Sequence, residues 1–313
     1  MNVGVLRGGW SLERAVSLRS GARIEGALRR LGHEPVPLDL DRELAPRLAR
    51  RDLGAVIVAV HGAGGDDGAA QGLLEAFEVA YTGSGPAAAA IAFDKPLTKR
   101  LFAAAGLPTP PFVTISSDAL RDLGLLASLP ELLESLGHPV VVKPARGGSA
   151  LGIRLARDTD EVAVALSMAL AYDREAIVER LVDGRDLAVS LIEVDGALVA
   201  LPVVEARPRE RSFYDFEARY TPGATVFDAP ADLPAAQAEE AQRLSVAACE
   251  LLGLRGPVRI DLMLDGDGSL WLLEANAVPG MTDTSLLPLA AGAAGIGFDE
   301  LVATLVSAVV PSV

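Results

Sequence analysis

Short apolar runs bounded by glycine, proline and polar residues recur along the chain and predict β-strands separated by amphipathic helices. Strands are expected at residues 2–6, 33–38, 55–60, 140–143 and 176–181, with a hairpin over 186–204. Helical spacing of the apolar positions predicts helices at 11–31, 69–79, 94–105, 235–252 and 298–309. The alternation of strands and helices near the start of the chain indicates an α/β unit with a parallel sheet.

A second β-hairpin is predicted over residues 258–275, where two apolar runs flank the turn sequence DGDG. Because strand side chains alternate between faces, Arg259 and Asp261 share a face, as do Glu274 and Asn276 on the returning strand. A turn made only of the DGDG residues would place Arg259 opposite Glu274. All four polar side chains would then lie together.

Two carboxylates and an amide amid Leu, Ile and Trp need compensation, because uncompensated buried charge is costly. Asp261, Glu274 and Asn276 offer oxygen ligands, which suit Mg²⁺ together with phosphate oxygens from a substrate. The alternative is a surface hairpin whose acidic residues face water. Apolar neighbours on both sides favour the metal site.

Composition argues against several classes of function. The chain of 313 residues carries a net charge of −14, which disfavours nucleic-acid binding because that requires a basic face. Half of the residues are hydrophobic, enough for two or three domains, yet none of the apolar runs is long enough to span a membrane. A single cysteine, Cys249, and a start without a signal-peptide pattern lead us to expect a cytoplasmic protein.

Two glycine-rich loops follow predicted strands and are candidate ligand sites. The loop at 61–68 follows an apolar strand, which is typical of a site at the carboxyl end of a parallel sheet. It lacks the GxGxxG spacing of a dinucleotide site, so the pattern does not favour an oxidoreductase. The loop at 144–152 follows Lys143 and could surround phosphate oxygens with N–H groups or form a simple hairpin turn.

The order of these pieces resembles the ATP-grasp superfamily: a lysine-bearing helix, a strand–lysine–glycine loop, a VER strand and an RID…LLEAN hairpin. Within it, the chain resembles the D-alanine–D-alanine ligase family from residue 4 to residue 288. The matching segments are LRGGWSLERAVS, AVHGAGGDDG, YTGSG, DK, VVKPARGGSALG, SFYDFEARY, GPVRIDLML and LLEANAVPGMTDTSLLP. The PGMT segment with the serine after it is specific to this family and is not a general nucleotide-binding signal.

The resemblance implies an α+β, two-domain ATP-grasp fold behind a Rossmann-like α/β domain. The boundaries would be 1–84 for the amino-terminal substrate-binding domain, 85–180 for the central subdomain and 181–313 for the carboxy-terminal subdomain with the metal site. The family also suggests a cytoplasmic homodimer that acts on small molecules, with neither nucleic acid nor a membrane as partner.

The implied reaction is the ATP-dependent joining of two D-alanines for peptidoglycan synthesis, and thus for cell-wall biogenesis and cell shape. The first D-alanine carboxylate would attack the γ-phosphate of ATP, and the amine of the second would displace phosphate from the resulting D-alanyl phosphate. The implied cofactors are ATP and two Mg²⁺ ions, for which Mn²⁺ could substitute. Phosphoryl transfer of this kind depends on positioning and charge stabilisation.

The resemblance also assigns roles to individual residues. The implied ATP ligands are Lys95, Lys143, Ser149, Glu179, Arg180, Leu181 and Asp186, and the implied metal ligands are Asp261, Glu274 and Asn276. The implied substrate-binding residues are Glu13, His61, Arg259, Gly280 and Ser285. The implied catalytic residues are Glu13, Ser149, Tyr214, Tyr220, Arg259 and Ser285. Lys99, one helical turn from Lys95, has no assigned role, and we expect it to be a solvated surface charge.

Several positions depart from the family pattern. Arginine replaces lysine at 180 and 219, aspartate replaces glutamate at 66 and 186, and alanine replaces threonine at 277. Arginine and lysine are not equivalent at directional contacts, so nucleotide affinity and substrate choice are the properties most affected. A paralogous ATP-grasp ligase acting on other amino or hydroxy acids therefore stays open as an alternative. A nucleotide sensor without catalysis is disfavoured, because the metal ligands and phosphate lysines are present.

Overall fold

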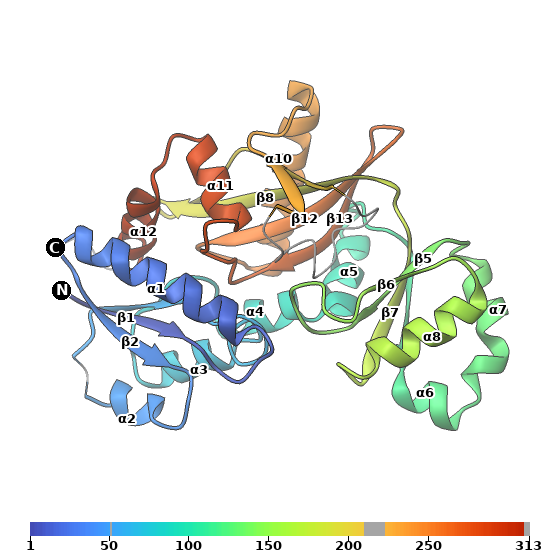
Figure 1. Ribbon diagram of the computed structural model, residues 1–313, viewed down its shortest axis with the longest axis horizontal. Coiled ribbons are helices and arrows are strands. Elements are labelled where there is room, and N and C mark those ends of the chain that lie inside the picture. The colour runs from blue at the N-terminus through green and yellow to red at the C-terminus, as the bar shows by residue number, and fades with distance from the viewer. Residues whose placement is uncertain (51, 210–222, 310–313) are drawn as a thin grey trace.

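A parallel sheet forms the first part of the molecule, as the alternation of strands and helices predicted. The computed structural model describes residues 1–50, 52–209 and 223–309 (Figure 1). The strands of this sheet lie in the order β2-β1-β3, all parallel. Their bounds, with those of the helices that follow them, are β1 (Asn2–Arg7), α1 (Arg14–Arg30), β2 (Glu34–Asp39), α2 (Leu44–Leu48), β3 (Ala55–Val58), α3 (Ala69–Ala76) and α4 (Pro86–Phe93).

A four-stranded antiparallel sheet, in the order β4-β7-β5-β6, follows in the chain. Its elements are β4 (Phe112–Ser116), α6 (Ser117–Asp122), η1 (Leu125–Ser128), α7 (Leu129–Glu134), β5 (Val140–Pro144), β6 (Arg154–Ala156), α8 (Thr159–Ala169) and β7 (Glu175–Arg180). Val140 and Val142 pack with α7 and α8 on one face. Strand alternation therefore turns Val141 and Lys143 to the other face, where Glu179 lies opposite Val141 in register.

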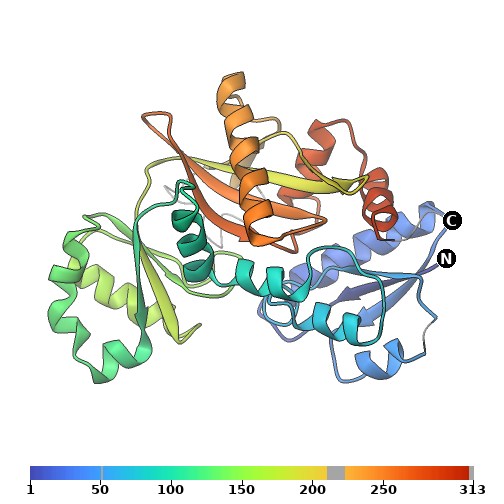
Figure 2. The same ribbon diagram turned by 180° about the vertical axis from the view of Figure 1, so that it is seen from behind.

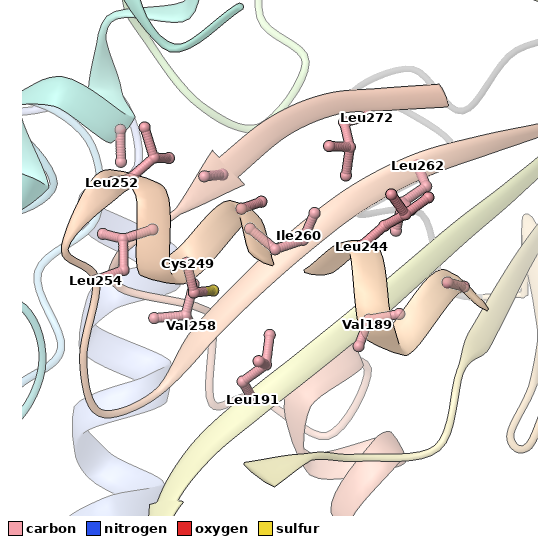
Figure 3. Packing of buried hydrophobic residues seen from close by; sticks show 14 of the residues in the cluster. Val189, Leu191, Leu244, Cys249, Leu252, Leu254, Val258, Ile260, Leu262 and Leu272 are labelled. Atoms are coloured by element: carbon pink, nitrogen blue, oxygen red, sulfur yellow. The ribbon is translucent and has the colours of Figure 1, made fainter. Parts of the chain in front are cut away.

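A six-stranded sheet, in the order β11-β10-β8-β12-β13 with β9 paired to β8, completes the molecule. Its elements are α5 (Lys95–Ala104), β8 (Gly184–Val194), β9 (Ala197–Ala200), β10 (Val204–Pro208), β11 (Thr225–Asp228), α10 (Ala235–Leu252), β12 (Val258–Asp265), β13 (Leu270–Asn276), α11 (Leu286–Ala293) and α12 (Phe298–Ser307). Helix α10 covers one face, where its Leu244 and Leu252 join Val189 and Ile260 in the core (Figure 3). Figure 2 shows this helix lying across the sheet.

The opposite face of the six-stranded sheet connects it to the parallel sheet. Ala188 and Ile192 of β8 share a hydrophobic core with α11, α12 and Ile24 of α1. The core of the four-stranded sheet is a separate cluster made of residues from that sheet and its own helices. The four-stranded sheet is therefore the part held least by shared apolar packing, and Figure 1 shows it on one side of the other two.

The predicted hairpin register is wrong, although the predicted convergence of its polar residues is confirmed. Asp261 pairs with Glu274 and Arg259 with Asn276, instead of Arg259 with Glu274. The pairing shifts after Asp261, and Leu273 is an extra residue in β13. This β-bulge matters because Leu272 faces the α10 core, and regular alternation would send Glu274 there too. The bulge turns Glu274 onto the face of Asp261 instead.

The sequence pattern missed one helix of 11 residues, α8, and a set of shorter elements, namely α2, α4, α6, η1, α7, β4, β6, β10, β11 and α11. The expected helix start at Ser11 is also wrong, since α1 begins at Arg14. Within the described ranges, no single helix has the length and apolarity to cross a membrane. Helices α11 and α12 meet these criteria only as a pair, and they are bent by 103° at their junction.

Candidate active site

A cavity of about 390 Å³ lies between the four-stranded and six-stranded sheets. Five of the residues expected to contact nucleotide line it: Lys143, Glu179, Arg180, Leu181 and Asp186. The guanidinium of Arg180 lies 5.3 Å from the centre of the Trp271 ring, a cation–π contact that fixes the arginine at the rim. A cavity that combines apolar walls with charged and polar side chains is typical of a small-molecule or cofactor site.

The apolar walls of this cavity are a feature that the sequence analysis did not identify. They include Val141, Ile153, Leu155, Met263 and Leu273. Strand alternation could have found two of them, because Val141 shares a face with Lys143, and Met263 shares a face with Asp261. The short strand β6, which carries Leu155, gave no recognisable pattern.

A smaller cavity of about 80 Å³ brings together the residues expected to bind substrate. Its lining includes Glu13, His61, Ser149, Arg259, Asn276, Gly280 and Ser285. These residues come from segments far apart in the chain, and the fold brings them together in one cavity. Tyr214, Tyr220 and Arg219 fall in 210–222 and lie outside the described residues.

Glu13 and Ser149 join the start of α1 to the glycine-rich loop. The Ser149 hydroxyl donates a hydrogen bond to Oε1 of Glu13. Ser149 has a left-handed backbone with φ of 56°, which a residue holds only when its surroundings compensate for the strain. Glu13 itself is the residue before α1, and its N–H donates to the Ser11 hydroxyl at 3.2 Å. The loop joins β5 and β6 as a hairpin connection, and its Gly148 and Ser149 line the small polar cavity; binding of phosphate by its N–H groups stays a prediction.

The hairpin places a bidentate ion pair beside the expected metal ligands. Arg259 Nε donates to Asp261 Oδ1 at 2.6 Å, and Nη2 donates to Oδ2 at 2.9 Å. Asn276 is held by the Val278 N–H, which donates to its Oδ1 at 3.0 Å. The described residues contain no group of three or more His, Cys, Asp or Glu side chains able to hold a metal ion. Two facing carboxylates and an amide oxygen still fit Mg²⁺, which commonly takes its other ligands from phosphates and water.

Lys95 is aimed at the glycine-rich loop by the way its helix begins. Asp94 caps α5, since its Oδ1 accepts the Leu97 N–H at 3.0 Å, and Lys95 is therefore the first helical residue. The Lys95 ammonium donates to the Gly147 carbonyl at 2.5 Å and lies 3.7 Å from Glu274 Oε2. It thus stands between the loop and the expected metal ligands, where phosphate groups would carry negative charge.

Lys99 is buried, so the expectation of a solvated surface charge is wrong. Its side chain is 1% exposed, and its ammonium lies 3.1 Å from Glu179 Oε2. It also donates to the Thr109 hydroxyl at 2.6 Å. The reason is the shared face: Lys95 and Lys99 are four residues apart, and this face of α5 packs toward β13. Glu179 also forms an ion pair with Lys143 through its other oxygen.

His61 is held as a neutral imidazole. Its Nδ1 lies 3.1 Å from the Val278 carbonyl and its Nε2 3.2 Å from the Ser20 hydroxyl, so Nδ1–H is the donor and Nε2 the acceptor. Burial lowers the pKa of His61 to about 4; the Val278 carbonyl opposes this effect and the positive charge of Arg259 adds to it. A neutral His61 can accept or donate a hydrogen bond at neutral pH without adding charge to the cavity.

The depressed pKa of His61 predicts a loss of stability in acid. Between pH 6.5 and about 4 the unfolded chain binds a proton at His61 that the folded chain does not, so stability falls as pH falls through this window. The loss should reach about 3 kcal/mol, because each pKa unit corresponds to about 1.4 kcal/mol. Urea unfolding of the parent and of His61→Gln at pH 7.5 and pH 4.5 measures it.

The parent should lose more stability between these pH values than His61→Gln does. His138→Gln, which alters an exposed histidine, is the matched control and should behave like the parent. An equal loss in the parent and His61→Gln would mean that His61 is protonated in the folded protein.

Asp66 lines the same small cavity, and the sequence analysis noted it only as a departure. The Gly62 N–H donates to its Oδ2 at 2.7 Å. Burial raises the pKa of Asp66 well above its ordinary value, and the charge of Glu13 raises it further. Both effects favour the protonated, uncharged form of Asp66, which limits the negative charge in this cavity.

Ser285 stands at the start of α11, where helix N–H groups favour an anion. Its hydroxyl oxygen lies 2.8 Å from the Thr282 hydroxyl and accepts the Thr282 N–H at 3.0 Å. Gly280 lies close by, since a Cβ there would approach the Ser285 hydroxyl to 2.7 Å. A carboxylate could thus meet a hydroxyl and backbone N–H groups at this end of the cavity.

Known proteins match this chain along nearly its whole length. The family model described as "D-ala D-ala ligase C-terminus" matches residues 101–307. D-alanine–D-alanine ligase from Stutzerimonas stutzeri is 40% identical over 303 residues, which cover 97% of this chain and 92% of that protein. The chain belongs to the D-alanine–D-alanine ligase family.

Solved structures of this ligase family agree in fold. The crystal structure of D-alanine–D-alanine ligase from Bacillus anthracis has a TM-score of 0.84 and 32% identity, and covers 98% of this chain and 96% of that one. The structure of the same protein complexed with ATP has a TM-score of 0.83 and 30% identity, with the same coverage. The predicted combination of an α/β unit with an ATP-grasp fold is confirmed for this D-alanine–D-alanine ligase family member.

Proposed function

We propose that this protein joins two D-alanines to D-alanyl-D-alanine through D-alanyl phosphate, with release of ADP and phosphate. One observation carries the proposal: the large cavity and the small polar cavity meet at the β12–β13 hairpin. Asp261 and Glu274 line the first, while Arg259 and Asn276 line the second. A phosphate donor in one cavity would therefore end beside an amino acid in the other.

The residues around the hairpin would carry the chemistry by position and charge. Glu13 would pair with the ammonium of the first D-alanine, and neutral His61 would lie near its carboxylate. Lys95 and Lys143 would neutralise phosphate charge as that carboxylate attacks the γ-phosphate. Asp261, Glu274 and Asn276 would hold two Mg²⁺ ions, which supply charge neutralisation on the phosphate oxygens.

The second step needs an anion-stabilising group and a site for a second carboxylate. Arg259 would stabilise the tetrahedral oxyanion that forms when the second amine attacks the acyl phosphate, and phosphate would leave. Ser285 and the Gly280 N–H would bind the carboxylate of the second D-alanine. Tyr214 and Tyr220, which the family resemblance counts among the catalytic residues, belong to this proposal as well.

The proposal includes the wider setting that the family suggests. The three divisions at 1–84, 85–180 and 181–313 would act as a substrate domain and two ATP-grasp subdomains. The protein would work in the cytoplasm as a homodimer and supply dipeptide for peptidoglycan. A paralogous ligase that uses another D-amino or hydroxy acid as second substrate is the alternative.

A single assay tests the proposal and its alternative. With ATP and Mg²⁺, D-alanine should stimulate phosphate release, and mass spectrometry should find D-alanyl-D-alanine in matching amount. A panel of L-alanine, D-serine and D-lactate serves as the comparison. Stimulation by L-alanine without D-alanine would reject the assignment, and a mixed product with D-serine or D-lactate would favour the paralogue.

A further inference from the structure

A buried carboxylate lies between two lysines that come from different parts of the molecule. Glu179 of β7 and Lys143 of β5 belong to the four-stranded sheet and line the large cavity. Lys99 belongs to α5, which packs against β13 and α10 of the six-stranded sheet. The ion pair of Lys99 and Glu179 therefore links the four-stranded sheet to a helix packed on the six-stranded sheet, with Glu179 lining the cavity and Lys99 outside its lining.

The six-stranded sheet also fixes the position of the Lys99 ammonium. The Thr109 hydroxyl accepts a hydrogen bond from Lys99 at 2.6 Å and donates to the Leu272 carbonyl of β13 at 2.9 Å. From the four-stranded sheet, Phe112 of β4 has its ring centre 5.2 Å from the same ammonium. Lys99 is thus anchored behind Glu179, with 1% of its side chain exposed.

The charges of this cluster do not cancel. Burial raises the pKa of Glu179, but Lys143 and Lys99 outweigh it and lower the pKa below its ordinary value. Burial lowers the pKa of Lys99, and the charge of Glu179 opposes this effect. With both lysines protonated and Glu179 ionised, two ammonium groups share one carboxylate, a formal charge of +1. Lys143, 8% exposed and lining the cavity, is where that charge meets a ligand.

We propose that Lys99 is a positioning residue for nucleotide binding: it neutralises Glu179 from behind, so that Lys143 remains a net positive charge for the phosphates. The inference rests on the proposed function, because it requires a polyphosphate in the large cavity. Without Lys99, Glu179 would neutralise Lys143 completely, and the pair would present no positive charge to a phosphate.

Binding measurements without D-alanine test this role separately from ligation. Calorimetry with ADP and Mg²⁺ reports on base and phosphates together, whereas adenosine reports on the base alone. Lys99→Met should weaken ADP binding at least about tenfold and adenosine binding less than about threefold. Arg100→Met, which removes an exposed charge from the same helix, is the control and should leave both affinities near the parent's.

A second variant separates charge from structural support. Glu179→Gln removes the carboxylate that Lys99 neutralises, so Lys99→Met combined with Glu179→Gln restores the surplus charge on Lys143. The double variant should bind ADP, relative to adenosine, better than Lys99→Met alone. Lys99→Arg, which keeps the charge, should also recover part of the loss.

The inference fails if Lys99→Met weakens adenosine binding as much as ADP binding. It also fails if the double variant binds ADP no more tightly than Lys99→Met does. Should Lys99→Met not fold, Glu179→Gln alone decides. The charge on Lys143 then increases, so the ADP-to-adenosine affinity ratio must equal or exceed the parent's, and a lower ratio overturns the inference. If the parent protein binds ADP normally but forms no dipeptide, the proposed function is rejected, while the binding test of Lys99 still applies.

Discussion

Glu274→Gln should abolish nearly all ATP turnover while leaving the fold intact. The substitution keeps the shape of the side chain but removes one of the two carboxylate charges that face each other across the β12–β13 hairpin. A metal ion bound to phosphates would lose a charged ligand, and we expect kcat/KM to fall by roughly a hundredfold or more. Phosphate release at increasing Mg²⁺ concentrations, with D-alanine saturating, measures the effect.

The hairpin offers a matched control for this substitution. Asp267→Asn removes the same charge from the exposed turn and should keep turnover close to the parent's. Thermal unfolding of both variants without ligands should stay near the parent's, because Glu274 is partly exposed. Turnover of Glu274→Gln within a few-fold of the parent at saturating Mg²⁺ would show that the hairpin does not hold the metal.

Lys95→Met and Lys143→Met should each cripple the reaction. Lys95 stands between the Gly147 carbonyl and Glu274, and Lys143 lines the large cavity beside Glu179. Loss of a phosphate contact in a water-poor site removes several kcal/mol of transition-state stabilisation, roughly a hundredfold or more in rate. Steady-state kinetics with saturating D-alanine on the purified variants provides the measurement.

The comparison for these variants is Arg100→Met, since Lys99 is buried and cannot serve as a surface control. Lys143→Met leaves Lys99 and Glu179 as a neutral pair, so the variant should fold. Full activity in either lysine variant would mean that the phosphates lie elsewhere.

The sequence predicted which polar residues of the hairpin lie together, but not the register in which its strands pair. Alternation placed Arg259 with Asp261, and Glu274 with Asn276, and these pairs depend only on positions two residues apart. The register depends on the turn and on a bulge at Leu273, and neither leaves a periodic signal in an apolar strand. The five-residue turn and the bulge therefore changed the pairing without separating the four polar residues.

For Lys99, the sequence showed which helix face the residue occupies but not whether that face is buried. Spacing showed that it shares a face with Lys95, yet burial of that face depends on β13, which lies far along the chain. Short helices such as α6 escaped prediction for a related reason. A helix of six residues with none of them buried has no apolar stripe to detect.

Because of the bulge at Leu273, the number of residues in β13 matters as well as their identity. Deleting Leu273 would move the side chains of Glu274 and Asn276 to the opposite face of the sheet, toward the α10 core. The two polar residues would still be present in the sequence. An inserted residue in the exposed turn at 265–268 could instead loop out without disturbing the pairs. Natural variants of this hairpin should therefore tolerate insertions and deletions at the turn and exclude them between Leu272 and Asn276.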